Sequence, residues 1–84
     1  MMVYRLVPVN VPLPFREIET YPDLIAALLR MEVRYYQLEK AHYRGPVEFR
    51  IERVDYTGST ARTTLIGEYY YQDGLKKVKE YNHE

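Results

Sequence analysis

The sequence contains no cysteine, which excludes disulfides, thiolate chemistry and cysteine-ligated zinc. It also has no excess of charge of one sign, because 12 Lys and Arg oppose 12 Asp and Glu, and the two halves of the chain are each nearly balanced. A broad electrostatic attraction to nucleic acid or to a membrane surface is therefore not expected. No apolar run approaches the roughly 18 residues of a membrane span, and no N-terminal signal pattern is present, so we expect a cytoplasmic protein.

The 84 residues are enough for one domain, residues 1–84, and too few for two cores. Leu, Ile, Val and Phe supply 22 residues, which is enough for a folded core of modest stability that self-association could supplement. Trp is absent and Phe occurs twice, whereas Tyr occurs ten times. Ten amphipathic rings do not all fit inside so small a core, so several are expected at its rim or in contact with a partner.

Residues 2–9 are rich in β-branched and aromatic side chains, which predicts a strand. Three prolines of the same parity lack the N–H groups that would pair along one side of an extended chain: Pro8, Pro12 and Pro14. The strand therefore lies at an edge of the sheet, or it ends near Val9. In the second case residues 10–15 form an extended segment over the surface.

A long helix is predicted over residues 21–44, which contain no glycine and only one proline, near the start. Thr20 is placed to cap the N-terminus, and Pro22 fits the first turn. At the other end, Gly45 can adopt the left-handed conformation of a C-cap, and Pro46 cannot continue the helix.

Three strands are expected after the helix, over residues 47–52, 61–72 and 75–81. A three-residue loop at 57–59 would pair Ile51 with Leu65, Phe49 with Gly67 and Val47 with Tyr69, so that Gly67 leaves room for the Phe49 ring. One face then carries the apolar side chains Val47, Phe49, Ile51, Leu65, Tyr69 and Val78.

Asp73-Gly74 is the strongest hairpin signal in the chain. With these two residues as the turn, Glu68 lies opposite Lys79 and Tyr69 lies opposite Val78, and both pairs are favourable. Residues 75–81 could alternatively form a short helix, and the strand is favoured over it.

These elements define an α+β fold, in which one long helix packs on a mainly antiparallel sheet of about four strands in the order β-α-β-β-β. The order resembles in outline the cystatin–monellin arrangement, where a sheet wraps one long helix. The hairpin with which cystatins plug cysteine proteases, of the type Gln-Val-Val-Ala-Gly, is absent, and residues 56–60 read Tyr-Thr-Gly-Ser-Thr instead. The resemblance thus implies a fold and no function.

The helix carries two apolar stripes. The first is expected to face the sheet and contains Leu24, Leu28, Met31, Tyr35, Leu38 and His42. The second contains Ile25, Leu29, Val33, Tyr36 and Tyr43. The remaining polar face contains Arg30, Arg34 and Gln37. A surface helix needs only one apolar stripe, so the second is covered either by residues 9–15 of the same chain or by a partner.

The second stripe favours a small non-catalytic module that binds another protein or a second copy of itself, with a homodimer as the expected form. Such an accessory, assembly or inhibitor protein needs no cofactor. An alternative is a binder of single-stranded nucleic acid that uses aromatic and basic side chains on strands: Tyr70, Lys76, Lys77 and Lys79. The balanced charge argues against this alternative, since lysines also protect edge strands from aggregation.

No catalytic constellation is found, so we do not expect an enzyme. Ser59 lies in a predicted turn without a neighbouring His, and no glycine-rich phosphate loop is present. Glu39 and His42 form one Glu-x-x-His motif, but a di-metal bundle needs two such motifs and two further carboxylates. We therefore expect His42 to be a packed histidine and no metal to bind, and His83 lies in a terminal segment expected to fray.

Overall fold

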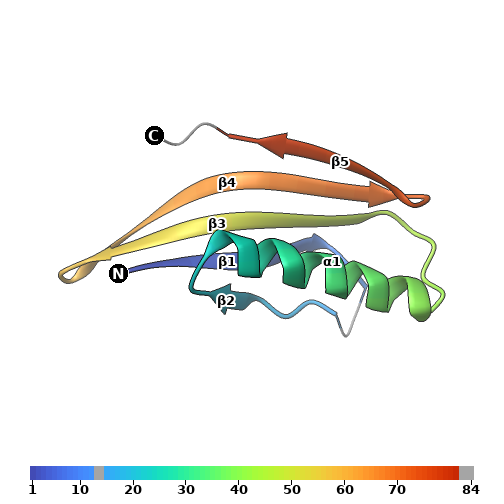
Figure 1. Ribbon diagram of the computed structural model, residues 1–84, viewed down its shortest axis with the longest axis horizontal. Helices are drawn as coiled ribbons and strands as arrows, with labels where there is room; N and C mark the ends of the chain where they lie inside the picture. The colour runs from blue at the N-terminus through green and yellow to red at the C-terminus, as the bar shows by residue number, and fades with distance from the viewer. Residues whose placement is uncertain (13–14, 82–84) are drawn as a thin grey trace.

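A computed structural model describes residues 1–12 and 15–81 and contains one helix on a five-stranded antiparallel sheet (Figure 1). The elements are β1 (Met2–Asn10), β2 (Glu19–Tyr21), α1 (Leu24–Lys40), β3 (Val47–Thr57), β4 (Thr60–Gln72) and β5 (Leu75–Glu80). The sheet order is β2-β1-β3-β4-β5, and α1 packs against the half formed by β1, β2 and β3. The α+β class is confirmed, and β2 is a fifth strand that the sequence did not predict.

β1 is an inner strand, so the prediction of an edge position is wrong. It pairs with β3 along most of its length, and its residues 4–6 also pair with β2. The second alternative is nearly right, because the strand ends at Asn10. Beyond it, Val11 is only 2% exposed and belongs to the core, which contradicts a purely superficial course for residues 10–15. Leu13 and Pro14 lie outside the described residues.

The helix begins and ends at other residues than predicted. Asp23 is the N-cap, and its carboxylate accepts a hydrogen bond of 2.8 Å from the Ala26 amide, whereas Thr20 belongs to β2. At the other end, His42 has a φ of 62° and takes the left-handed position that Gly45 was predicted to occupy. Its amide donates to the Glu39 carbonyl and the Tyr43 amide donates to the Leu38 carbonyl, the two bonds of a Schellman motif.

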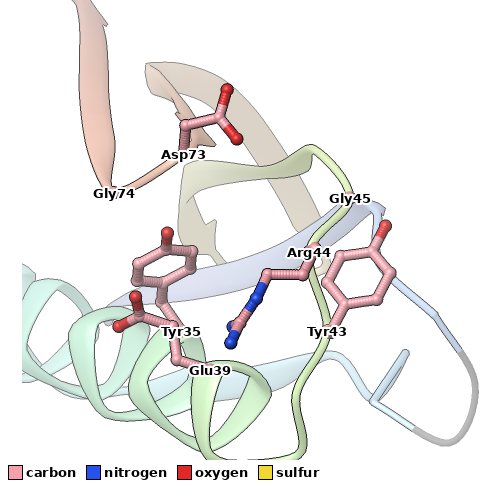
Figure 2. Close-up of a pocket in the computed structure, with 7 residues that line it drawn as sticks. All are labelled: Tyr35, Glu39, Tyr43, Arg44, Gly45, Asp73 and Gly74. Carbon is pink, nitrogen blue, oxygen red and sulfur yellow. The ribbon is translucent and has the colours of Figure 1, made fainter.

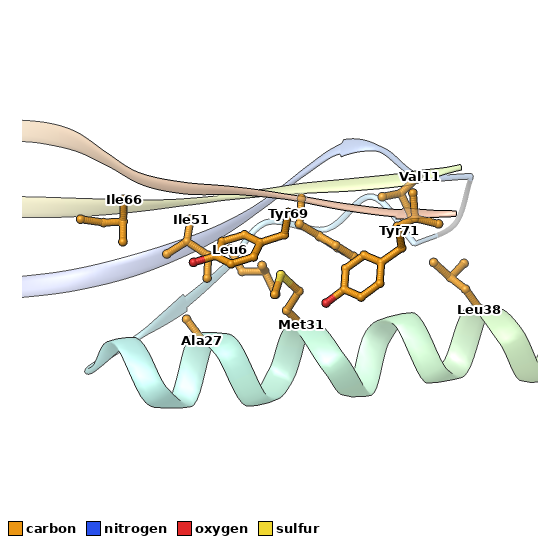
Figure 3. Packing of buried hydrophobic residues seen from close by; sticks show 11 residues of the cluster. Leu6, Val11, Ala27, Met31, Leu38, Ile51, Ile66, Tyr69 and Tyr71 are labelled. Carbon is orange, nitrogen blue, oxygen red and sulfur yellow. The ribbon is translucent and has the colours of Figure 1, made fainter. Parts of the chain in front are cut away.

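The side of α1 that faces the sheet is rotated from the predicted stripe. Its buried residues are Ala27, Met31, Arg34 and Leu38. Figure 3 shows the three apolar ones pointing at Leu6, Ile51, Tyr69 and Tyr71 of the sheet. The predicted core residues Leu24, Leu28 and Tyr35 are partly buried at the border of this cluster, and His42 is exposed. The placing of Arg34 on the polar face and of His42 in the core is therefore wrong.

Arg34 is buried because the chain before the helix surrounds its guanidinium with acceptors. The guanidinium donates to the carbonyl of Glu17 at 2.7 Å and to the carbonyl of Phe15, and it forms an ion pair of 3.1 Å with the Glu19 carboxylate. It also lies 5.5 Å from the ring centre of Phe49. One side chain thus joins the helix, the segment 15–19 and the centre of the sheet.

The predicted register between β3 and β4 is wrong. The turn contains two residues, Gly58 and Ser59, and Gly58 alone has a positive φ, 60°, as the first central position of a type II′ turn requires. A register shift between Ile51 and Glu52 then moves Gly67 opposite Ile51. As a result Phe49 pairs with Tyr69 and Val47 with Tyr71. Leu65 is only partly buried, and Val78 is 45% exposed, so neither belongs to the core.

The predicted register between β4 and β5 is confirmed at every pair. Glu68 lies opposite Lys79 and Tyr69 opposite Val78. Asp73 and Gly74 both have positive φ, 53° and 78°, as a type I′ turn requires. β5 is therefore a strand, and the helical alternative is wrong.

Replacing Gly74 with valine should lower the free energy of unfolding by about 1–2 kcal/mol, because a β-branched side chain resists a φ of 78°. Apart from its two chain neighbours, no described residue has an atom within 4 Å of a Cβ at this position, so the loss would come from the backbone rather than from a clash. Urea unfolding of Gly74→Val and Gly74→Asn compares them, and asparagine, which tolerates the left-handed region, should lose less. Equal losses would contradict the turn geometry.

Candidate interaction surface

Four of the five predicted partner-binding residues form one exposed apolar row on the side of α1 that faces away from the sheet. Ile25 is 69% exposed, Leu29 63%, Val33 44% and Tyr36 52%. We call these four residues the helix stripe. Two apolar residues of the segment expected to cover it lie elsewhere, because Val11 belongs to the core cluster and Phe15 packs against that cluster. Leu13 lies outside the described residues. The four side chains of the stripe are therefore exposed within the part of the chain that the structure describes.

Tyr43, the fifth predicted residue, lies after the end of the helix and does not join the stripe. Its ring is partly buried against the core cluster, and its hydroxyl donates to the Pro46 carbonyl at 3.0 Å. The ring also lies so close over Gly45 that a Cβ there would overlap its hydroxyl end. Gly45 is thus required by the packing of Tyr43, not by the helix cap that the sequence predicted.

A basic residue, Arg30, lies beside the helix stripe on one side, and an acidic residue, Glu32, lies beside it on the other. We call these two sides the basic flank and the acidic flank. On the β2 side, Arg30 forms an ion pair of 3.4 Å with Glu19 and keeps 40% of its side chain exposed. On the side of β4 and β5, Glu32 forms an ion pair of 2.5 Å with Lys76 and keeps 47% of its side chain exposed. Both side chains are therefore anchored within the chain, and part of each remains exposed.

Tyr71 contacts Glu32, the residue of the acidic flank, from the side of the core. Its ring stacks on Tyr35 with centroids 4.2 Å apart, and its hydroxyl donates to the Glu32 carboxylate at 2.9 Å. Burial, followed by this hydrogen bond, raises the pKa of Tyr71 above its ordinary value. The phenol therefore stays protonated at neutral pH and keeps donating to Glu32. The fold loses the contribution of this hydrogen bond to its stability only at alkaline pH, where the phenol is deprotonated.

The residues of the nucleic-acid alternative do not share one surface. Alternation along β4 and β5 places Tyr70, Lys77 and Lys79 on the face opposite the helix, whereas Lys76 lies on the helix side and contacts Glu32. Tyr70, Lys77 and Lys79 line a hollow of about 170 Å³ whose wall also contains Glu48 and Glu68. Two carboxylates among two lysines give no net attraction for phosphates.

We expect no measurable binding of random single-stranded DNA or RNA at moderate salt. Fluorescence anisotropy with labelled oligonucleotides at two salt concentrations measures this, with Tyr70→Ala as the variant that removes the exposed ring. An affinity that falls with salt and is lost in Tyr70→Ala, while the folding of the variant is intact, would contradict the expectation and support the alternative.

A second hollow, of about 270 Å³, lies between the end of α1 and the β4–β5 turn (Figure 2). Its wall contains Tyr35, Glu39, Tyr43, Arg44 and Asp73, together with Gly45 and Gly74. The wall contains no histidine or hydroxyl nucleophile beside a base, and His42 is exposed outside it. Within residues 1–12 and 15–81, no three His, Asp or Glu side chains gather as metal ligands would, and His83 lies outside these residues.

Comparisons with known proteins do not assign this chain to a family. No family model matches the chain, and no curated protein and no solved structure is detectably similar to it. In the part of the chain that the structure describes, α1 is neither long nor apolar enough to cross a membrane. The inference of function therefore depends on the surfaces described above.

Proposed function

We propose that this protein is a small non-catalytic protein–protein interaction module that binds through the helix stripe. The observation that supports the proposal is the exposure of Ile25, Leu29, Val33 and Tyr36 together on one face of the only helix among the described residues. Isolated exposed apolar side chains are ordinary, but a contiguous row with polar flanks is typical of an interaction site.

The stripe is also held rigidly, which favours binding. The opposite side of α1 is anchored by the buried residues Ala27, Met31 and Leu38 and by the hydrogen bonds of Arg34. The helix therefore does not have to become ordered when a partner binds, and little of the interaction energy is lost to ordering. A large aromatic ring, Tyr36, lies at one end of the row, and tyrosine is enriched among residues that dominate interface energies.

The proposal is tested by comparing Leu29→Asp with Leu75→Asp. Both leucines are exposed, 63% and 73%, but Leu29 lies in the stripe and Leu75 lies on β5. A charge in the stripe should weaken association with protein partners at least tenfold, whereas the same change on β5 should not. Association is measured by sedimentation of the pure protein and by affinity capture, and thermal melting checks that both variants fold.

Association that is unchanged in Leu29→Asp, with a folded variant, would exclude the helix stripe as the binding surface. Equal weakening in both variants would contradict the proposal as well, since it would show an effect of added charge that does not depend on position.

A further inference from the structure

The flanks of the helix stripe indicate which partner it fits. We infer that the partner is a second copy of this chain, and that the two α1 helices pack face to face across a two-fold axis with their N-termini pointing in the same direction. This inference rests on the proposed function, and it adds the partner and the geometry of the complex.

The spacing of the stripe determines where two copies meet. Ile25, Leu29 and Val33 are four residues apart and form one ridge along the helix. Ridges of this kind from two helices interdigitate at a crossing angle of about 50°. Two crossed helices touch mainly near the middle of their ridges, which here is between Leu29 and Val33. Charged side chains at that height therefore decide how two copies are oriented.

Arg30 and Glu32 lie at the height of this crossing, on opposite flanks of the stripe. In a two-fold pair with helices pointing the same way, the basic flank of one copy faces the acidic flank of its partner. Arg30 then approaches the partner's Glu32, and the symmetry repeats the contact. With helices in opposite directions, each flank faces the same flank of the other copy. Arg30 would then meet Arg30 of the other copy, and Glu32 would meet Glu32. Charge therefore favours the first arrangement and disfavours the second.

Both side chains can take part without losing their contacts within the chain. Arg30 and Glu32 keep 40% and 47% of their side chains exposed, so part of each remains available for a contact with a partner. The β2 side and the β4–β5 side of the sheet hold them in place through Glu19 and Lys76. Four large side chains and two flanking charges from each copy bury on the order of 1,000 Å², which is at the lower end of specific interfaces. The dimer is therefore reversible rather than obligate.

The test is a charge exchange within the flanks, measured by sedimentation equilibrium at low salt for the wild type, Arg30→Glu, Glu32→Arg and the double variant. In the same-direction dimer each single variant replaces two attractive contacts with two repulsive ones, so the dissociation constant should rise about tenfold. The double variant restores opposite charges across the interface and should return to within about twofold of the wild type.

The opposite-direction dimer predicts another pattern, because each single variant only replaces one like-charged contact with another. Equal dimerisation in all four proteins would therefore overturn the inferred geometry. Glu32→Arg also removes the bonds to Tyr71 and Lys76, so Arg30→Glu, which touches no buried group, provides the decisive single variant if the other unfolds.

Two further outcomes separate this inference from the proposed function. A wild-type protein that stays monomeric at high concentration, while other proteins bind it in a Leu29-dependent manner, would overturn the second copy as the partner and leave the proposed function standing. A dimer that persists in Leu29→Asp would overturn both, since the contact would then lie elsewhere. Weakening in both single variants with recovery in the double variant supports both.

Discussion

Replacing Arg34 with methionine should lower the free energy of unfolding by about 3–5 kcal/mol. Methionine fills similar space and tolerates burial, but it cannot donate to the carbonyls of Phe15 and Glu17 or neutralise Glu19. These acceptors would be left without their partner beside a side chain that is only 5% exposed. Urea unfolding followed by circular dichroism measures the loss.

Arg30→Met is the matched control. Arg30 lies one turn earlier on the helix and pairs with the same carboxylate, but 40% of its side chain is exposed, so its loss should cost less than about 1 kcal/mol. A similar cost for both variants would mean that water reaches the acceptors around Arg34, which would contradict its role as a buried link between the helix and residues 15–19.

Gly67→Ala should destabilise the fold by about 2 kcal/mol, although strands usually accept alanine at least as well as glycine. The ring of Tyr69 folds back over Gly67, and a Cβ at this position would come within 2.7 Å of the tyrosine hydroxyl and 2.9 Å of the ring carbon that carries it. The ring, which is 3% exposed, would have to leave its place in the core. Thermal or urea unfolding of the single variant measures this loss.

A double-mutant cycle isolates the cause. In a Tyr69→Val background there is no ring over Gly67, so adding Gly67→Ala should cost little or even stabilise the strand. An equal loss in both backgrounds would show that the backbone of β4, rather than the ring, requires glycine here.

The features that were predicted correctly depend on residues that are close together in the chain. The Asp73-Gly74 turn has two residues, which sets the β4–β5 register and with it the pairs Glu68–Lys79 and Tyr69–Val78. The existence of the helix followed from the start and stop signals around residues 21–44 and from the absence of glycine between them. The four residues of the helix stripe were identified as a second apolar row, but the sequence left open whether residues 9–15 cover it, because that depends on a distant contact.

Some of the wrong predictions concern local signals, namely the two helix caps and the length of the β3–β4 turn, and others depend on distant contacts. The burial of Arg34 requires the carbonyls of Phe15 and Glu17, and no pattern in the sequence of the helix indicates that these acceptors lie beside it. β2 has only three residues, whose partners lie at positions 4–6 of β1. The predicted β3–β4 register was wrong first at the turn, which has two residues instead of three. It was displaced again at a shift next to Ile51, which alternation along one strand cannot reveal.

The candidate sites show the same division. Lys76 could be placed opposite Tyr71 from the hairpin register, but its contact with Glu32 joins the hairpin to the helix and is not visible in either segment alone. Tyr43 was assigned to the stripe by extending the helix beyond Lys40, where the left-handed His42 ends it.

The position of β1 between β2 and β3 has a consequence for how the chain folds. β3, β4 and β5 are joined by two tight turns and can pair soon after they meet, whereas β1 must close a loop that reaches at least from Asn10 to Glu48 before its first pair with β3 forms. During synthesis β1 leaves the ribosome before β3, so it remains without its partners on β3 until residues 48–55 have emerged. Folding should start from the C-terminal half of the chain, and the rate-limiting step should be the insertion of β1 into a sheet whose other half is already formed.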